Sequence, residues 1–169
     1  MSLGNPKAKI EVIEYASVAC PHCAHFNDEV FPAFKAKWID TGKVKLIYRD
    51  FPLDEAALKA AQIAECSGND RYFAIIDLIF SSQPKWAATS DPAIAFADLA
   101  KLLRVAGMSD GFIKDCVAND KVSNTVLNRQ LGGKKLGVDS TPTLYVNGQQ
   151  FKGARSVEEL EGVFGKLAN

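Results

Sequence analysis

Alternation of apolar and polar positions predicts four short β-strands in the chain. The first strand-like run is rich in β-branched and aromatic residues, which is typical of a mostly buried strand. Pro52 ends the second run, and Asn147-Gly148 favours a two-residue hairpin turn between the last two. We expect the strands over residues 9–16, 44–51, 143–146 and 150–152.

Apolar residues at helical spacing predict the helices. The first helix runs from Cys20 to about Asp40, and Pro32 inside it should kink or break it because proline lacks a backbone N–H. A capping box at Ser156-Val157-Glu158-Glu159 starts the last helix, which ends near Leu167. Between the second and third strands lie only helical segments, over residues 54–66, 70–80, 91–106, 109–118 and 121–136.

The order of these elements predicts the fold class. If the helical block is removed, the order β-α-β-β-β-α remains, which is the thioredoxin order. We therefore expect an α/β protein with a thioredoxin-like mixed β-sheet flanked by helices and an inserted all-helical subdomain. The predicted thioredoxin-like domain is discontinuous and comprises residues 1–53 and 124–169, and the insertion comprises residues 54–123.

Composition excludes several classes of partner. The chain has 20 Lys and Arg against 20 Asp and Glu, which argues against nucleic acid or an anionic membrane surface as the main partner. No apolar run approaches the roughly 18 residues that span a bilayer, so the chain is not expected to cross a membrane. The N-terminus lacks a secretory signal, and Met1–Gly4 resembles residues added for expression. We expect that a natural leader or N-terminal extension has been removed.

The motif Cys20-Pro21-His22-Cys23 carries the candidate chemistry. It lies between the first predicted strand and the first predicted helix, where thiol–disulfide chemistry would place it. At the first helical turn the helix dipole favours a thiolate on Cys20, while Pro21 suits that turn and His22 can add a donor or a positive charge. Each unit by which the pKa falls is worth about 1.4 kcal/mol. We expect an exposed Cys20 that forms mixed disulfides and a shielded Cys23 that resolves them.

A metal site is the main alternative use of this segment. Cys20, His22, Cys23 and His25 are soft or borderline donors that zinc or copper would accept. However, His22 stands between the two cysteines, and the sequence has no second cluster of cysteine and histidine. We therefore expect no metal and no cofactor, and we interpret His25 as an ordinary, partly exposed helix residue.

Two motifs in this order resemble a known family. The run from Val12 to Cys23 resembles the first strand and active site of DsbA-family thiol–disulfide oxidoreductases, and the run from Leu136 to Gly148 resembles their second signature. The helical insertion between the motifs also matches, so the resemblance covers nearly the whole chain. Ser140 stands where many relatives have glycine.

The resemblance implies roles for residues outside the first motif. It implies a cis bond before Pro142 and a Thr141 backbone exposed to an extended substrate peptide, whereas an ordinary trans proline at a strand start is the alternative. It also implies that Glu14 is a buried acid that exchanges a proton with Cys23. The alternative for Glu14 is the polar position of a half-exposed strand.

The two remaining cysteines fall in the helical block. A disulfide between Cys66 and Cys116 would close a loop of about 50 residues, worth about 4 kcal/mol in the chain-entropy model. Two buried thiols are the alternative. An oxidising compartment favours the structural disulfide, which is the tentative expectation here.

The primary functional hypothesis is a periplasmic or otherwise extracytoplasmic DsbA-like oxidase. It would donate the Cys20–Cys23 disulfide to folding proteins that contain cysteines, and a membrane redox partner would re-oxidise it, as the resemblance implies. A disulfide isomerase or reductase is the first alternative, although that role usually needs reduced active-site cysteines and often a dimer. A copper- or zinc-binding module using the same cysteines is the second.

Overall fold

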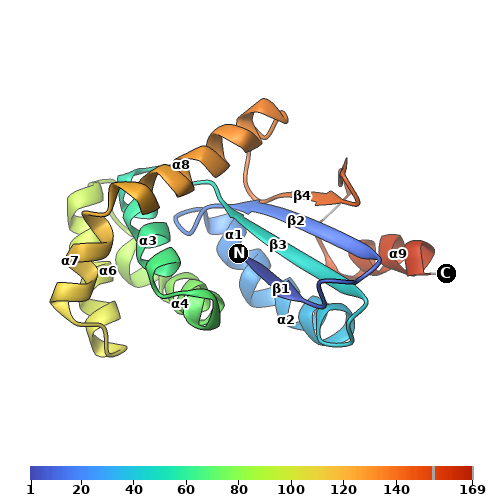
Figure 1. Ribbon diagram of the computed structural model, residues 1–169, viewed down its shortest axis with the longest axis horizontal. Helices are drawn as coiled ribbons and strands as arrows, with labels where there is room; N and C mark the ends of the chain where they lie inside the picture. Colours follow the sequence, from blue (N-terminus) through green and yellow to red (C-terminus); the bar gives the residue numbers. More distant parts are fainter. Residues whose placement is uncertain (154, 169) are drawn as a thin grey trace.

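The structure is a computed structural model that describes residues 1–153 and 155–168. A mixed β-sheet forms the centre of the molecule, and a block of helices extends from one end of it (Figure 1). The strand order is β1-β3-β2-β4-β5, in which β2 and β3 pair in parallel and the other neighbours pair antiparallel. The strands are β1 (Ser2–Gly4), β2 (Ile10–Ala16), β3 (Val44–Asp50), β4 (Thr143–Val146) and β5 (Gln149–Gln150). The thioredoxin-like sheet with a helical insertion is therefore confirmed.

The strand predictions differ from the structure at the two edges of the sheet. The edge strand β1 was not predicted, because three residues are too short to show an alternating pattern. At the opposite edge, β5 begins one residue earlier than expected. The hairpin turn before it has positive φ at both Asn147 (45°) and Gly148 (80°), as a two-residue turn of this kind requires.

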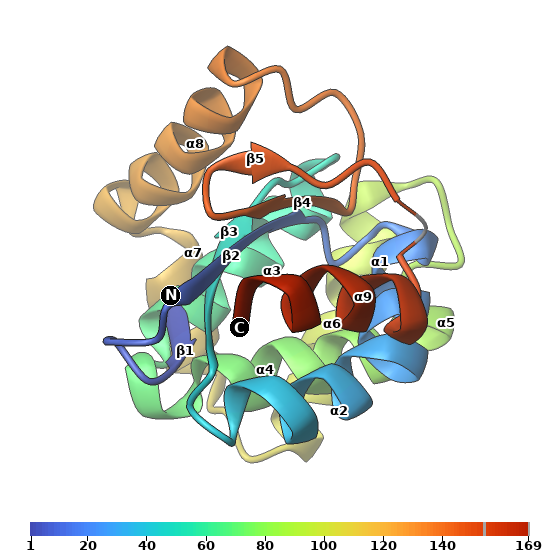
Figure 2. The same cartoon turned by 90° about the vertical axis from the view of Figure 1, so that its right-hand side faces the viewer.

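Helices cover both faces of the sheet. Side chains alternate along β2, so Ile10, Val12 and Glu14 point to one face and Ile13 to the other. Figure 2 shows α9 (Val157–Ala168) and the helix that follows β2 on one side of the sheet, and α8 (Asp120–Lys135) on the other. The α9 side holds a larger apolar cluster than the α8 side, where Tyr15 is among the residues packed.

The helix after β2 is interrupted, as predicted from Pro32. It consists of α1 (Pro21–His25), the π-helical segment η1 (Phe26–Val30), α2 (Phe31–Phe34) and the π-helical segment η2 (Lys35–Ile39). Its far end is fixed against α9, because Phe34 stacks on Phe164 at 5.5 Å between ring centroids and Trp38 meets the same ring at 5.3 Å.

The helical block follows β3. Asp54, Asp91, Ser109 and Asn119 cap four of its helices by accepting hydrogen bonds from first-turn backbone N–H groups. One short helix, α5, lies where no helix was predicted. The helices before α8 are α3 (Glu55–Cys66), α4 (Asn69–Ser81), α5 (Gln83–Trp86), α6 (Pro92–Val105) and α7 (Asp110–Val117).

A buried ionic cluster attaches the helical block to the sheet. Asp50 at the end of β3 is 2% exposed and accepts hydrogen bonds from the Tyr72 hydroxyl of α4 at 2.9 and 3.0 Å. Arg129 of α8 pairs with Asp50 at 3.3 Å and with Glu65 of α3. Burial, followed by the charge of Glu65, raises the pKa of Asp50 to about 6, whereas Tyr72 and Arg129 oppose the rise. Because α8 packs on both parts, the division at residues 123 and 124 stays a prediction.

Replacing Arg129 should destabilise the chain, and more so at higher pH. In Arg129→Met, the buried Asp50 and the half-buried Glu65 lose their cation, which we expect to cost about 3 kcal/mol in the free energy of unfolding at pH 8. The pKa of Asp50 is raised in the folded chain, so its ionisation opposes folding as the pH rises through about 6. The loss at pH 5 should therefore be smaller. Urea unfolding at both pH values measures it.

Arg104→Met is the matched control for this prediction. Arg104 pairs with Asp110 at 2.8 Å, but both side chains are largely exposed. Its loss should therefore cost less than about 1 kcal/mol at either pH. Equal losses in the two variants, or a pH-independent loss in Arg129→Met, would contradict a structural role for the buried cluster.

Candidate active site

The chain places Cys20 at the start of a helix directly after the central strand β2. Cys20 is the N-cap of α1, with extended backbone angles (φ −83°, ψ 120°), and Pro21 occupies the first turn as predicted. The Cys20 N–H donates to the Ser17 carbonyl at 3.0 Å, which closes the short loop from the strand. The Cys20 sulfur therefore lies at the positive end of the helix.

Cys20 is more buried than the sequence suggested, whereas Cys23 is shielded as expected. Cys20 is 5% exposed and Cys23 is 0% exposed, so the prediction of an exposed Cys20 is wrong, although the order of the two is as expected. Cys20 packs in the same apolar cluster as Cys23, and the Thr141 loop covers its sulfur. Pro21 and His22 are the exposed members of the motif.

The second signature meets the first at the Cys20 sulfur. The bond between Thr141 and Pro142 is cis, as the resemblance implied. In its thiol form, Cys20 donates to the Thr141 carbonyl at 3.3 Å, although the two residues are 121 positions apart. Pairing of β4 with β2, in which Thr143 lies opposite Tyr15, holds this loop beside the start of α1.

The surroundings make the two thiols very different acids. Hydrogen bonding from the Cys23 thiol is the largest cause that lowers the pKa of Cys20, to about 5. Thr141 and the backbone N–H groups of Cys23 and His22 add to this, and burial opposes it. Burial, together with the neighbouring Cys20, raises the pKa of Cys23 far above its ordinary value. At neutral pH the pair therefore carries one negative charge, on Cys20.

The histidines contribute little to this geometry. His22 acts on the Cys20 pKa through its backbone, and the side chains of His22 and His25 are both exposed. Over residues 1–153 and 155–168, no three His, Cys, Asp or Glu side chains are grouped as a metal site would require.

Glu14 is buried on the face of β2 that packs against the first helix. It is 4% exposed, so the alternative of a half-exposed strand position is wrong. Burial raises the pKa of Glu14 to about 8, which leaves its carboxyl group mostly protonated at neutral pH. Its parallel partner on β3 is Tyr48, whose pKa is raised first by burial, then by the charge of Asp50, and also by the charges of Glu14, Cys23 and Cys20. Glu14 and the two thiols therefore act on the same buried hydroxyl.

Sequence reasoning missed Gln83, which lies in the unpredicted helix α5. Gln83 is buried, and its side-chain amide donates to the Val18 carbonyl at 2.7 Å and to the Cys20 carbonyl at 3.1 Å. It thereby ties the helical block to the loop that presents Cys20. No sequence signal could have found it, because the contact joins residues more than 60 positions apart.

Cys66 and Cys116 are brought together as thiols. The expected disulfide is not formed in this structure, where both sulfurs are free. Burial, followed by a hydrogen bond with Cys66, raises the pKa of Cys116 to about 12. Their pairing under oxidising conditions stays a prediction. Nearby, the buried Gln62 amide donates to the carbonyls of Cys116 and Val117, at 3.4 and 3.1 Å.

Comparison with known proteins finds relatives that match most of the chain. A thioredoxin family model matches residues 1–164. A Rickettsia typhi protein named as a protein-disulfide oxidoreductase is 36% identical over 152 residues, which are 89% of this chain and 55% of that protein. The chain thus spans about half the length of that relative. Disulfide bond formation protein D of Bacillus subtilis is 24% identical over 166 residues, covering 94% of this chain and 72% of that protein.

Solved structures agree with the sequence comparisons. α-DsbA1 of Wolbachia pipientis superposes with a TM-score of 0.89 and 31% identity, over 99% of this chain and 89% of that chain. A protein-disulfide isomerase from Novosphingobium aromaticivorans also superposes with a TM-score of 0.89, over 99% and 97% of the two chains. At 23% identity, the second similarity supports the fold alone.

Removing the Cys23 thiol should raise the pKa of Cys20. Cys23→Ala loses the strongest hydrogen bond to the Cys20 thiolate, so the pKa of Cys20 should rise from about 5 by about one to two units. Cys23→Ser keeps a hydroxyl donor at the same place and should raise the pKa less. Titration of the thiolate ultraviolet absorbance measures both. Equal values in the two variants would show that the Cys23 hydrogen bond is not the main cause.

Gln83 should position the active-site loop as well as stabilise the fold. Gln83→Met leaves the buried Val18 carbonyl without its side-chain donor, while the Cys20 carbonyl keeps the backbone N–H groups of Cys23 and Ala24. We expect this to cost about 1 kcal/mol of stability and to raise the pKa of Cys20. Gln62→Met is the matched control, because Gln62 makes the same kind of contact far along the chain from Cys20. It should lose similar stability by urea unfolding and leave the Cys20 pKa unchanged. The same pKa response in both variants would contradict a positioning role.

Proposed function

The chain belongs to the DsbA family within the thioredoxin fold, and from this premise we propose that it passes its Cys20–Cys23 disulfide to folding proteins. The observation that carries the proposal is the opposite shift of the two thiols, with the pKa of Cys20 lowered to about 5 and that of Cys23 raised. Stabilisation of the Cys20 thiolate favours the reduced dithiol over the disulfide. A disulfide that is less favoured than its dithiol is an oxidant.

The proposed reaction is a double thiol–disulfide exchange. A substrate thiolate attacks the Cys20 sulfur, the bond between Cys20 and Cys23 breaks, and Cys23 leaves with the electron pair and takes up a proton. A second substrate thiolate then attacks the substrate sulfur of the mixed disulfide and releases Cys20 as a thiolate. The substrate loses two electrons and gains a disulfide, and the chain gains the same two electrons. The low pKa of Cys20 makes it the better leaving group of the final step.

We assign Glu14 as the proton donor to Cys23 in the first exchange. The raised pKa of Cys23 means that its thiolate must be protonated as it leaves, and its burial keeps bulk water away. Glu14 is protonated at neutral pH and is buried on the same side of the sheet as α1. The charges of Glu14 and Cys23 both raise the pKa of Tyr48, so both groups lie near this side chain. In the reverse direction, when the dithiol is re-oxidised, the same carboxylate accepts the proton.

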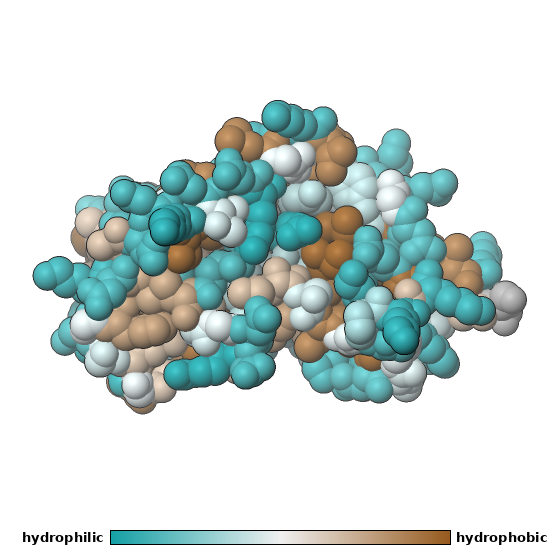
Figure 3. All heavy atoms as spheres, in the orientation of Figure 1, coloured by the Kyte–Doolittle hydropathy of each residue, from teal (hydrophilic) through white to brown (hydrophobic). Residues whose placement is uncertain are grey.

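Exposed apolar side chains support a protein substrate. Leu53 is 56% exposed, and its N–H reaches the Ser17 hydroxyl of the active-site loop at 3.4 Å. Leu131 and Leu136, 52% and 62% exposed, lie at the C-terminal end of α8, where Figure 3 shows apolar atoms on the surface. The Thr141 backbone beside Cys20 would pair with an extended segment of the substrate by strand addition. Unfolded chains offer both an extended backbone and apolar side chains.

The proposed chemistry requires an oxidising compartment. We infer an extracytoplasmic location, where substrate cysteines are not kept reduced by glutathione and thioredoxin. Each turnover leaves the dithiol, so a separate oxidant must restore the disulfide, and we propose a membrane redox partner for this step. None of the described helices is both long and apolar enough to cross a bilayer by itself.

Equilibration with glutathione tests the direction of electron flow. We expect the Cys20–Cys23 couple to be more oxidising than about −200 mV, because the DsbA couple lies near −120 mV and the thioredoxin couple near −270 mV. Separating the oxidised and reduced chains after acid quenching measures the ratio. A value near that of thioredoxin would overturn the oxidase assignment and favour the reductase alternative.

Refolding of a substrate separates the oxidase from the isomerase alternative. The oxidised chain should form disulfides in a reduced, unfolded substrate at stoichiometric amounts. The reduced chain should not accelerate recovery of a substrate with scrambled disulfides beyond the rate in glutathione alone. Faster recovery with the reduced chain would support an isomerase.

A further inference from the structure

A small pocket of about 90 Å³ adjoins the loop that presents Cys20. It is lined by Ala19, by Asp54 at the start of α3, and by residues from the end of α5 to the start of α6. Figure 2 shows the segment between α5 and α6 beside the start of α1. Leu53, which precedes Asp54, donates its N–H to the Ser17 hydroxyl of the same loop at 3.4 Å. Because Ala19 and Cys20 are consecutive, the pocket lies next to the place where a substrate cysteine would bind.

The most buried part of the pocket is apolar. Trp86 is 1% exposed, and its indole N–H already donates to the Ile79 carbonyl at 2.9 Å, so it offers its ring and no free donor to an occupant. Such a surface suits the methylene stem of a long side chain, which is stabilised by leaving water. The other apolar lining residues are Ala19, Ala87, Pro92 and Ala95.

The polar side chains of the lining all carry oxygen acceptors. They are Asp54, Thr89 and Ser90. One Asp54 oxygen caps α3 by accepting from the Ala57 N–H at 2.7 Å, and within the described part of the chain the other oxygen makes no hydrogen bond. The lysine ammonium group has three N–H donors and no acceptor, so it matches a set of oxygens.

The charges at the pocket favour a cation over an anion. Two helices begin there, and a carboxylate accepts first-turn N–H groups of each, Asp54 on α3 and Asp91 on α6. Each helix start carries about half a positive charge, which the full negative charge of its capping carboxylate exceeds. Among the residues that the structure describes, no cation pairs with Asp54. Lys85 on α5 is exposed and does not line the pocket.

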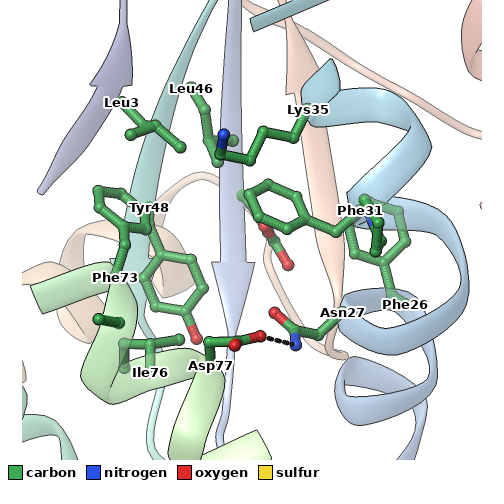
Figure 4. A pocket seen from close by; sticks show the side chains of 13 residues that line it. Leu3, Phe26, Asn27, Phe31, Lys35, Leu46, Tyr48, Phe73, Ile76 and Asp77 are labelled. Atoms are coloured by element: carbon green, nitrogen blue, oxygen red, sulfur yellow. Dashed lines mark hydrogen bonds between the residues drawn. The ribbon is translucent and has the colours of Figure 1, made fainter. Parts of the chain in front are cut away.

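The pocket at Asp54 differs from the larger hollow on the α4 side of the sheet (Figure 4). Aromatic side chains wall that hollow, and Glu14 lines it, so it adjoins the proposed proton donor. Its charged side chains are engaged, because Asp77 accepts a hydrogen bond from the Asn27 amide at 3.1 Å and Lys35 forms an ion pair at 2.8 Å. Asp54 is thus the carboxylate that is placed to meet a substrate.

We propose that this pocket is a specificity subsite for a lysine side chain that lies one or two positions from the substrate cysteine. The ammonium group would bind the free oxygen of Asp54 and the hydroxyls of Thr89 and Ser90, and the stem would pack on Trp86. In an extended segment these positions lie within about 7 Å of the cysteine. The inference rests on the proposed function, because a mixed disulfide at Cys20 is what brings the substrate to the pocket.

Peptides with one cysteine test the proposal on the unmodified chain. Lysine, glutamine or glutamate is placed one or two positions before or after the cysteine, and acid quenching follows reduction of the Cys20–Cys23 disulfide. Each rate is divided by the rate of the same peptide with glutathione disulfide, which removes differences in thiol reactivity. In at least one of the four positions, lysine should be about fivefold faster than glutamine, the upper end for a partly exposed ion pair, and glutamate should be slowest.

The absence of a lysine preference at all four positions would overturn the subsite. Failure of the proposed function gives a different result, because the glutamine peptides would then leave the Cys20–Cys23 disulfide intact. The two proposals can therefore fail separately.

A pair of charge variants locates the preference. Asp54→Asn removes the charge and keeps an N-cap residue, so it should fold normally and react equally fast with the lysine and glutamine peptides. Asp139→Asn is the matched control, because Asp139 is an exposed carboxylate in the loop before Pro142 and does not line the pocket. It should keep the preference. An unchanged preference in Asp54→Asn, or equal losses in both variants, would refute recognition at Asp54.

Ala87→Leu tests the pocket without changing its charge. The larger side chain fills space that the lysine stem would occupy, so the lysine preference should fall while urea unfolding shows that the chain still folds. A full preference in Ala87→Leu would show that the lysine binds outside the pocket.

Discussion

One negative charge shared unequally between two neighbouring thiols is the interaction on which the active site depends. Cys20 and Cys23 are one helical turn apart in an apolar cluster, where two thiolates would repel each other without water to screen them. This repulsion is avoided because Cys20 is ionised while Cys23 stays protonated. The hydrogen bond between them favours this division, because it lowers the pKa of Cys20 and raises that of Cys23.

The rest of the fold places three segments around that charge. The end of β2 sets the start of α1, the register of β4 on β2 brings Thr141 to the sulfur, and α5 of the helical block sends Gln83 to the loop between them. The pKa of Cys20 is lowered first by the hydrogen bond from the Cys23 thiol, and then by Thr141 and by the backbone N–H groups of Cys23 and His22. The insertion is thus part of the active site as well as a cover for it.

The sequence predicted whatever is encoded locally. The strand alternation, the helix caps, the interruption at Pro32 and the two signatures all depend on residues within a few positions of one another, and the structure agrees with them. The burial of Glu14 followed from its position in an apolar strand and from family resemblance. A charged residue such as Glu14 inside an apolar strand is the only local sign in the sequence that the side chain interacts with residues far along the chain.

The features that the sequence did not predict all depend on tertiary contacts. Cys20 is buried by a loop 121 positions away, and Gln83 is recognisable only once α5 lies against the active-site loop. The ion pair between Arg129 and Asp50 joins two residues that are far apart in the sequence, so no local pattern predicts it. The strand β1 is too short to show an alternating pattern of apolar and polar residues. It forms because its backbone pairs with the edge of β3. Distance along the chain, and not weakness of the interactions, limited the prediction.

The π-helical segment η1 has a mechanical consequence for the redox cycle. It separates the five residues of α1 from α2 and η2, whose Phe34 and Trp38 are clamped against Phe164. Closing or opening a disulfide changes the spacing of two sulfurs in the first turn alone. The widened turn of η1, directly after α1, can accommodate this change as a small twist. The packing of Phe34 and Trp38 on Phe164 then stays the same in both redox states.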